Sequence, residues 1–262
     1  MTRIENVFRD RARKALVAYV TVGYPSVEAT LSAVPALVAA GCDMIELGIP
    51  FSDPLADGAT IQEASARALG NGVTPQVCLD VAARLRQVVS VPLLFMTYYN
   101  PVLQFGLARF CEAAAGAGVD GLIVPDLPPE ESGELEEAAR RHGLEVVFLL
   151  SPASTPARIR LVVEKSGGFI YLVSLMGVTG ARRHLPPGLE AFVRRVRSFT
   201  GKPLCVGFGI SGPEQARRAG QVADGIIVGS RIVELLATGS PPYPRVTALV
   251  AALRQALDRC TA

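Results

Sequence analysis

The amino-acid sequence predicts an α/β fold of the (β/α)8 TIM barrel class, and three observations support this prediction. Eight short apolar runs alternate with longer amphipathic segments along the chain. Runs that are almost continuously apolar are typical of parallel strands covered on both faces. The length of 262 residues suits a closed barrel of eight units, which takes roughly 250 residues. An open doubly wound sheet is the alternative architecture.

Each predicted strand is a short apolar run bounded by residues that favour turns. The strands are Ala15–Val22, Met44–Gly48, Pro92–Met96, Gly121–Val124, Glu145–Leu150, Phe169–Val173, Pro203–Gly207 and Gly225–Val228.

The predicted helices fill the segments between these strands, and several begin with capping chemistry. Ser154-Thr155 precedes Pro156, and Ser211-Gly212 precedes Pro213, which is typical of a helix start. Pro129-Glu130-Glu131 is expected to place acidic side chains in a first turn. The helices are Val27–Ala40, Ile61–Leu69, Pro75–Val88, Leu103–Gly116, Glu130–His142, Pro156–Glu164, Gly188–Ser198, Pro213–Ala219, Arg231–Leu236 and Tyr243–Cys260, and Ile4–Lys14 is predicted as an extra helix below the barrel.

These elements predict a single barrel domain over residues 1–262, with extra helices at the N-terminus and after the second and eighth strands. The net charge is only +2, from 26 basic and 24 acidic residues, so we expect no nucleic-acid partner. No apolar run reaches the length of about 18 residues that favours a membrane span. The five cysteines include no CxxC pair, which indicates free thiols in a reducing cytoplasm.

Chemistry in a barrel of this class belongs to the carboxyl ends of the strands and the loops that follow them. The three lysines, Lys14, Lys165 and Lys202, fall at the opposite end, so the sequence offers no lysine for a Schiff base. The two histidines, His142 and His184, are far apart and lack a cysteine cluster. We therefore expect no metal site.

Glu46 interrupts the second apolar run. Side chains alternate along a strand, so Glu46 is predicted to point into the barrel mouth while Ile45 and Leu47 face the helices. Burial would raise its pKa toward a value useful for proton transfer at neutral pH. Tyr171 is predicted to point inward by the same alternation. A structural carboxylate and a packing aromatic are the respective alternatives.

Loop aspartates form the second group of candidates. Asp53 and Asp57 lie in the proline-rich loop after the second strand, and Asp126 follows the fourth. Taken one at a time, such residues are more often turn formers. Asp57 at the far end of its loop is predicted to share acid–base work with Glu46.

Glycine-rich loops follow three successive strands. They are Gly177–Gly180, Gly207–Gly212 and Gly229-Ser230, and the last precedes a short helix. Glycines allow close backbone approach, and helix N-termini offer free N–H groups to an anion. The loops after strands seven and eight form the recurrent phosphate site of these barrels. The sequence therefore predicts a phosphorylated substrate.

The motifs together resemble the tryptophan synthase α subunit family over essentially the whole chain. The longest is ELGIPFSDPLADG, and the matching segments are 46–58, 60–62, 96–102, 125–126, 177–180, 207–211 and 229–230. Three features depart from the commoner pattern: Ala59 replaces a proline, Tyr24 replaces an aspartate, and Leu175-Met176 stands where an Arg-Ala pair is frequent.

The resemblance implies cleavage of indole-3-glycerol phosphate to indole and glyceraldehyde 3-phosphate, a retro-aldol reaction without a cofactor. It implies that Glu46 is the general acid–base and that Asp57 holds the indole N–H. Tyr171 would line the site near the reacting carbons. It further implies that the substrate phosphate is held by Gly180, Gly209, Gly229 and Ser230. Phe208 would pack beside the substrate, and Thr179 would meet Asp57 when a lid closes.

The loops at the expected mouth are apolar and proline-rich, which favours docking of a partner, although they could simply wall the pocket. The resemblance implies a pyridoxal-phosphate β subunit in an αββα heterotetramer, with Pro50, Asp53 and Pro54 facing the partner. Three alternatives stay open: a stand-alone indole-releasing lyase, a non-catalytic activating subunit, and a phosphate-binding isomerase or epimerase.

Overall fold

The strands form one parallel sheet that closes on itself. The computed structural model describes residues 1–10, 12–173, 188–207 and 209–260. The sheet order is β5-β4-β3-β2-β1-β9-β8-β7-β6, and all of its pairings are parallel. The strands are β1 (Ala15–Thr21), β2 (Met44–Gly48), β3 (Leu93–Met96), β4 (Gly121–Ile123), β5 (Glu145–Val147), β6 (Leu149–Leu150), β7 (Ile170–Val173), β8 (Leu204–Gly207) and β9 (Gly225–Val228).

Strands β5 and β6 are two parts of the predicted fifth strand, separated at Phe148. One part pairs with β4 and the other with β7, and the Tyr171 N–H donates to the Phe148 carbonyl at 3.1 Å. The two outer members of the sheet are therefore one continuous segment. The predicted (β/α)8 barrel is confirmed, and the open sheet is ruled out.

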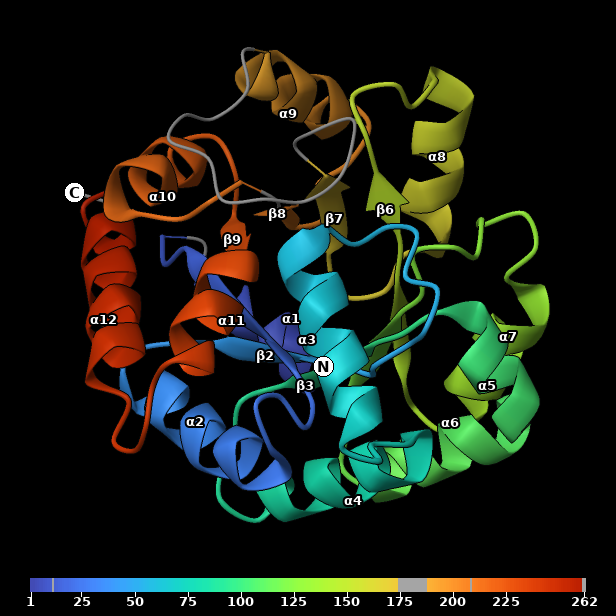
Figure 1. The fold of residues 1–262 in the computed structure, drawn as a ribbon. Helices are drawn as coiled ribbons and strands as arrows, with labels where there is room; N and C mark the ends of the chain where they lie inside the picture. The colour runs from blue at the N-terminus through green and yellow to red at the C-terminus, as the bar shows by residue number, and fades with distance from the viewer. Residues whose placement is uncertain (11, 174–187, 208, 261–262) are drawn as a thin grey trace.

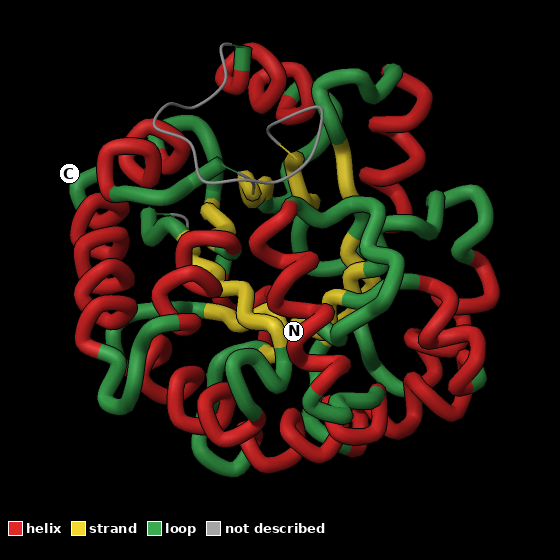
Figure 2. The backbone as a smooth tube through the Cα atoms, in the orientation of Figure 1, coloured by secondary structure: helices red, strands yellow, loops and turns green. Residues whose placement is uncertain are grey.

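Helices surround the strands on all sides (Figures 1 and 2). Because helices cover the outer face and side chains fill the interior, every residue of β1, β2, β8 and β9 is buried. The helices are α1 (Arg3–Val7), α2 (Val27–Ala39), α3 (Ala59–Gly70), α4 (Pro75–Arg86), α5 (Tyr99–Phe105), α6 (Leu107–Gly116), α7 (Gly133–Arg141), α8 (Pro156–Lys165), α9 (Leu189–Arg197), α10 (Pro213–Gly220), α11 (Ser230–Ala237) and α12 (Pro244–Asp258).

The extra helices are confirmed as α1, as the pair α3 and α4, and as the pair α11 and α12.

The capping predicted at the starts of α8 and α10 is correct for α8 and differs in its details for α10. The Thr155 hydroxyl accepts from the Arg158 N–H at the start of α8. At α10 the N-cap residue is Gly212, whose N–H donates to the Gln215 side chain.

The single helix predicted over residues 103–116 is wrong, because two helices, α5 and α6, lie there. Gly106 separates them with a φ of 92°, in the left-handed region that favours glycine. The first of the two starts earlier than predicted, since the Asp126 carboxylate accepts from the Tyr99 N–H at 2.9 Å. The acceptor comes from the loop after the next strand, which the local sequence does not reveal.

Two of the other predicted helices differ most from the structure, in which they are shorter. Helix α1 ends at Val7 rather than at Lys14, because the residues after Phe8 are mostly charged and supply no apolar face to bury. Helix α7 begins at Gly133, after a turn in which the Glu131 N–H donates to the Pro128 carbonyl. Glu130 and Glu131 therefore precede the first turn, where Glu134 and Glu136 lie instead.

Aspartates secure the N-terminal end of the barrel. Asp43, Asp120 and Asp224 each immediately precede a strand. Each carboxylate accepts a backbone N–H at the start of the strand before, from Leu16, Leu93 or Leu204, at 2.8–2.9 Å. Each also pairs with arginine: Asp43 with Arg13 and Arg254, Asp120 with Arg3 and Arg86, and Asp224 with Arg197. This end of the barrel therefore serves stability.

We expect Asp120→Ala to lower the free energy of unfolding by about 3 kcal/mol, because it leaves the mostly buried Arg86 guanidinium without its counter-charge. The Asp120 and Arg86 side chains are only 8% and 16% exposed. Urea unfolding measures the loss. The matched control is Glu137→Ala, which breaks the exposed pair with Arg141 and should cost less than about 1 kcal/mol. Equal losses in the two variants would contradict the role given to Asp120.

Candidate active site

Glu46 lies at the centre of β2, between Tyr19 of β1 and Leu94 of β3 in the sheet register. Its side chain is fully buried, and neither carboxylate oxygen has a hydrogen-bond partner within the described ranges. Burial raises the pKa of the Glu46 carboxyl to about 8. A buried carboxyl without a partner costs stability, so a functional reason for its presence is needed.

Asp57 lies at the end of the loop between β2 and α3 and is 5% exposed. Its Oδ2 atom accepts a hydrogen bond from the Tyr98 hydroxyl at 3.1 Å. The Gln62 side-chain amide donates to the Asp57 carbonyl at 2.9 Å. Burial raises the pKa of the Asp57 carboxyl to about 6, although the Tyr98 hydrogen bond lowers it. At neutral pH the Asp57 carboxyl is therefore mostly ionised and the Glu46 carboxyl mostly protonated.

Two buried tyrosines lie close to both carboxylates. Tyr171 on β7 and Tyr19 on β1 are 4% and 6% exposed. Burial is the main cause that raises the pKa of each phenol, and the charges of Glu46 and Asp57 raise it further. Glu46 and Asp57 therefore both interact electrostatically with the same two buried phenols.

Glycines make room for these two phenol rings. A Cβ atom on Gly207 would lie 2.5 Å from the Tyr171 ring, and one on Gly48 would overlap the Tyr19 hydroxyl. Gly48 and Gly207 are therefore required at the carboxyl ends of β2 and β8. Sequence reasoning missed Tyr19, although the alternation of side chains along its own strand could have predicted that it points inward; its register opposite Glu46 comes from the sheet pairing.

The burial of Glu46 predicts a pH-dependent cost in stability. The carboxyl has its ordinary pKa of 4.5 when unfolded and about 8 when folded. Between these values the folded chain holds one more proton, so the free energy of unfolding falls as pH rises through the window. Since glutamine does not titrate, we expect Glu46→Gln to gain a few kcal/mol relative to the wild type between about pH 5 and about pH 9.

Urea unfolding of both proteins at the two pH values measures that gain. Glu63→Gln, at an exposed position on α3, is the control and should show no comparable change. A pH-independent difference between Glu46→Gln and the wild type would mean that Glu46 ionises as easily in the folded chain as in the unfolded chain.

The predicted phosphate-binding residues lie partly within the described structure. Gly209 has a φ of 81° just beyond β8, and Gly229 precedes Ser230, the first residue of α11. A Cβ atom on Gly229 would lie 3.5 Å from the Tyr19 side chain, so this turn borders the space that holds the two acids. Gly180 of the phosphate set lies outside the described residues, as do Thr179 of the predicted lid, Phe208, which is predicted to pack beside the substrate, and Leu175-Met176.

The loop after β2 exposes only part of the segment predicted to face a partner. Pro50 is buried, Pro54 is partly buried and Asp53 is exposed. Leu55 is 87% exposed, which is unusual for a large apolar side chain. The exposed part of this loop is therefore centred on Asp53 and Leu55, and Pro50 packs within the chain.

Tyr24 and Ala59, which differ from the common family pattern, and the loop aspartate Asp126 have positions that the structure explains. Tyr24 is buried, with the Arg67 guanidinium 5.7 Å from its ring centre. Ala59 is the first residue of α3, where many residue types are accepted. Asp126 accepts from the N–H of Tyr99, and this role explains its position without substrate.

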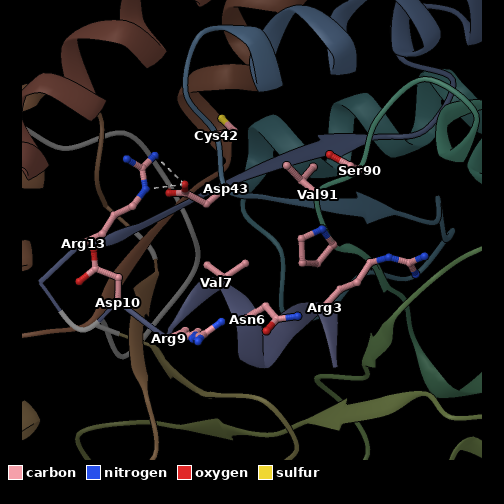
Figure 3. Close-up of a pocket in the computed structure, with 11 residues that line it drawn as sticks. Arg3, Asn6, Val7, Arg9, Asp10, Arg13, Cys42, Asp43, Ser90 and Val91 are labelled. Atoms are coloured by element: carbon pink, nitrogen blue, oxygen red, sulfur yellow. Dashed lines mark hydrogen bonds and ion pairs between the residues drawn. The ribbon is translucent and has the colours of Figure 1, made fainter. Parts of the chain in front are cut away.

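A pocket of about 720 Å³ lies at the opposite end of the barrel, between α1 and the starts of β2 and β3. Figure 3 shows Arg13 paired with Asp43 there, while Arg3 and Asn6 project from α1. These charges belong to the aspartate–arginine pairs that hold the strand starts. In the part of the chain that the structure describes, no three His, Cys, Asp or Glu residues could hold a metal ion, and no helix could cross a membrane.

A closed barrel with a protonated acid and an ionised acid at one mouth defines an acid–base enzyme of the (β/α)8 class. Residues 6–258 match the family model described as tryptophan synthase alpha chain. The chain belongs to the tryptophan synthase alpha chain family.

Relatives and solved structures agree with this assignment. The tryptophan synthase alpha chain of Dehalococcoides mccartyi is 57% identical over 98% of this chain and all of the relative. That of Chloroflexus aurantiacus is 48% identical over 98% of each. The crystal structure of the Legionella pneumophila alpha subunit matches with a TM-score of 0.92, 35% identity and 99% coverage of both chains. A chain of Mycobacterium tuberculosis tryptophan synthase matches with a TM-score of 0.90 and 40% identity, over 97% of this chain and 96% of that one.

Proposed function

We propose that this protein cleaves indole-3-glycerol phosphate to indole and glyceraldehyde 3-phosphate, as the α subunit of tryptophan synthase. The observation that carries the proposal is Glu46, a fully buried carboxyl without a partner among the described residues. Family membership supplies the substrate, and the raised pKa of about 8 supplies an acid that still holds its proton at neutral pH.

Glu46 first gives its proton to C3 of the indole ring, which leaves a positive charge on the ring nitrogen. The Glu46 carboxylate then takes the proton from the glycerol hydroxyl next to C3. The bond between C3 and the glycerol carbon breaks, and the hydroxyl oxygen becomes the carbonyl of the aldehyde. The electron pair restores the ring double bond and neutralises the nitrogen. Glu46 ends with one proton, as it began, so the cycle needs no further reactant.

The Asp57 carboxylate accepts a hydrogen bond from the indole N–H and stabilises the positive charge that develops on the ring nitrogen. Its carboxyl suits this role because it is mostly ionised at neutral pH, with a pKa of about 6, and because a buried charge acts strongly in a low dielectric. Tyr171, which is 4% exposed, lines the site beside the reacting carbons.

The substrate phosphate binds to the turns after β8 and β9, through Gly209, Gly229 and Ser230. The turn at Gly229 opens α11, and the first N–H groups of a helix attract anions. We propose that Gly180 completes this site, that Thr179 reaches Asp57 when a lid closes, and that Phe208 packs beside the substrate.

The protein works with a tryptophan synthase β subunit in an αββα heterotetramer. Exposed Leu55 and Asp53 on the loop after β2 support this docking surface. The cofactor pyridoxal phosphate belongs to the β subunit, which consumes the indole. All five cysteines are free, which supports a location in a reducing cytoplasm.

An indole-release assay tests this function, with the pure chain alone and with the β subunit of the same organism. We expect slow release alone and faster release in the mixture. Fast release alone would identify a stand-alone lyase, and activation of β without any cleavage would identify a non-catalytic subunit. The mass of the mixed complex in solution tests the stoichiometry.

A further inference from the structure

Tyr98 lies two residues after the end of β3 and is the N-cap residue of α5. Its side chain is 5% exposed. The hydroxyl donates to Asp57 Oδ2 at 3.1 Å and accepts from the Ala56 N–H at 3.0 Å. One phenol oxygen therefore holds both the carboxylate and the backbone of the residue before it.

The ring of Tyr98 makes a third contact with the same loop. It stacks on Phe51, with ring centres 5.2 Å apart and planes inclined by 29°. Such offset stacking contributes beyond the area that it buries. Because β3 is anchored in the barrel, Tyr98, two residues beyond its end, fixes the loop at both Phe51 and Asp57.

We propose that Tyr98 is a positioning residue that fixes the orientation of the Asp57 carboxylate toward the substrate's ring nitrogen. This inference rests on the proposed function, in which Asp57 receives the indole N–H. A carboxylate on a loop reaches the required geometry only when other groups restrict its rotamer. Tyr98 supplies that restriction from a different strand, through a hydrogen bond to a charged acceptor.

The electrostatics of the site agree with this role. Burial raises the pKa of Asp57, and the Tyr98 hydrogen bond opposes that rise. The other titratable groups on which the Asp57 charge acts are Tyr19 and Tyr171. Both are phenols, and their own pKa values are raised well above 10. Neither supplies positive charge, so among the residues that the structure describes the Tyr98 hydroxyl is the group that favours the ionised Asp57 carboxylate.

Tyr98→Phe tests the proposal because it keeps the ring and its stacking on Phe51 and removes only the hydroxyl. Tyr99→Phe is the matched control at the next position, where the side chain is only partly buried. Kinetics of indole release with the β subunit present should show about a tenfold lower kcat for Tyr98→Phe near neutral pH, with a smaller change in KM. Tyr99→Phe should behave as the wild type.

The pH profile separates positioning from a purely structural role. We expect the acid limb of kcat/KM to move to higher pH by about one pH unit in Tyr98→Phe, since the lost hydrogen bond favoured the ionised Asp57. A uniform fall at every pH, with the limb unmoved, would overturn the proposal. Kinetics that match the wild type throughout would overturn it as well.

A measurement without turnover distinguishes this inference from the proposed function. Carbon-13 NMR of the Asp57 carboxyl gives its titration midpoint in the wild type and in Tyr98→Phe, and the missing resonance of Asp57→Asn assigns the signal. A higher midpoint in Tyr98→Phe supports the role of Tyr98 even if the wild type releases no indole. An unchanged midpoint refutes it even if the wild type is fully active.

Discussion

Glu46→Gln should reduce indole release by about a thousandfold, within the range that a positioned general acid–base contributes. Glutamine has nearly the same size and fits the same buried place, so the barrel should remain folded. It cannot give a proton to C3 or take one from the glycerol hydroxyl. Both transfers depend on one group, so their loss falls on kcat rather than on KM.

Single-turnover release of indole with the β subunit present measures this loss. The matched control is Glu145→Gln, which changes a glutamate that also belongs to a strand but lies at the start of β5, beside Thr2. That variant should keep wild-type turnover. Turnover by Glu46→Gln within about tenfold of the wild type would remove Glu46 from the acid–base role.

The buried carboxyl of Glu46 lowers the stability of the fold, whereas the proposed reaction requires it. The strand would be more stable with an apolar residue at this position, as at its neighbours Ile45 and Leu47, which are fully buried. The carboxyl departs from the pattern and carries a pKa near 8. Such a local conflict with the rest of the fold is expected at functional sites, which is why Glu46 could be found from the sequence.

The strands were predictable because strands that are buried on both faces need continuous apolar runs. The bounds of β2 and β9 agree with the prediction at both ends. The break at Phe148 was not predictable, because an apolar residue continues the run while the pairing partner changes from β4 to β7. Closure of the sheet, rather than the local sequence, sets that break.

The missed helix start and the unpredicted contact of Tyr98 with Asp57 have a common cause. Asp126 determines where α5 begins, and Tyr98 holds Asp57 from 41 positions away. Both contacts join loops that follow different strands, and only the assembled barrel brings those loops together. The inward direction of Glu46, by contrast, could be predicted from the alternation of side chains along its own strand. The roles of Gly180, Thr179 and Phe208 stay predictions, since these residues lie outside the described structure.

Asp57→Asn should lower kcat by about a hundredfold to a thousandfold, the range measured when one preorganised group opposite a developing charge is removed. Asparagine keeps an oxygen that can accept the indole N–H, so substrate binding should change little. It lacks the negative charge that stabilises the protonated ring, and that charge matters most when C3 has received its proton. The loss should therefore fall on kcat, with KM within a few-fold of the wild type.

The pH dependence of kcat/KM in the wild type and in Asp57→Asn gives a second test of this role. In the wild type, kcat/KM should fall as pH drops through about 6, where the Asp57 carboxyl takes up its proton. In Asp57→Asn that limb should vanish, because the group that causes it no longer titrates. Asp80→Asn, at an exposed position on α4, controls for the loss of a charge and should keep the wild-type profile. A change in KM alone would make Asp57 a binding group, and a limb that survives in Asp57→Asn would assign the titration to another residue.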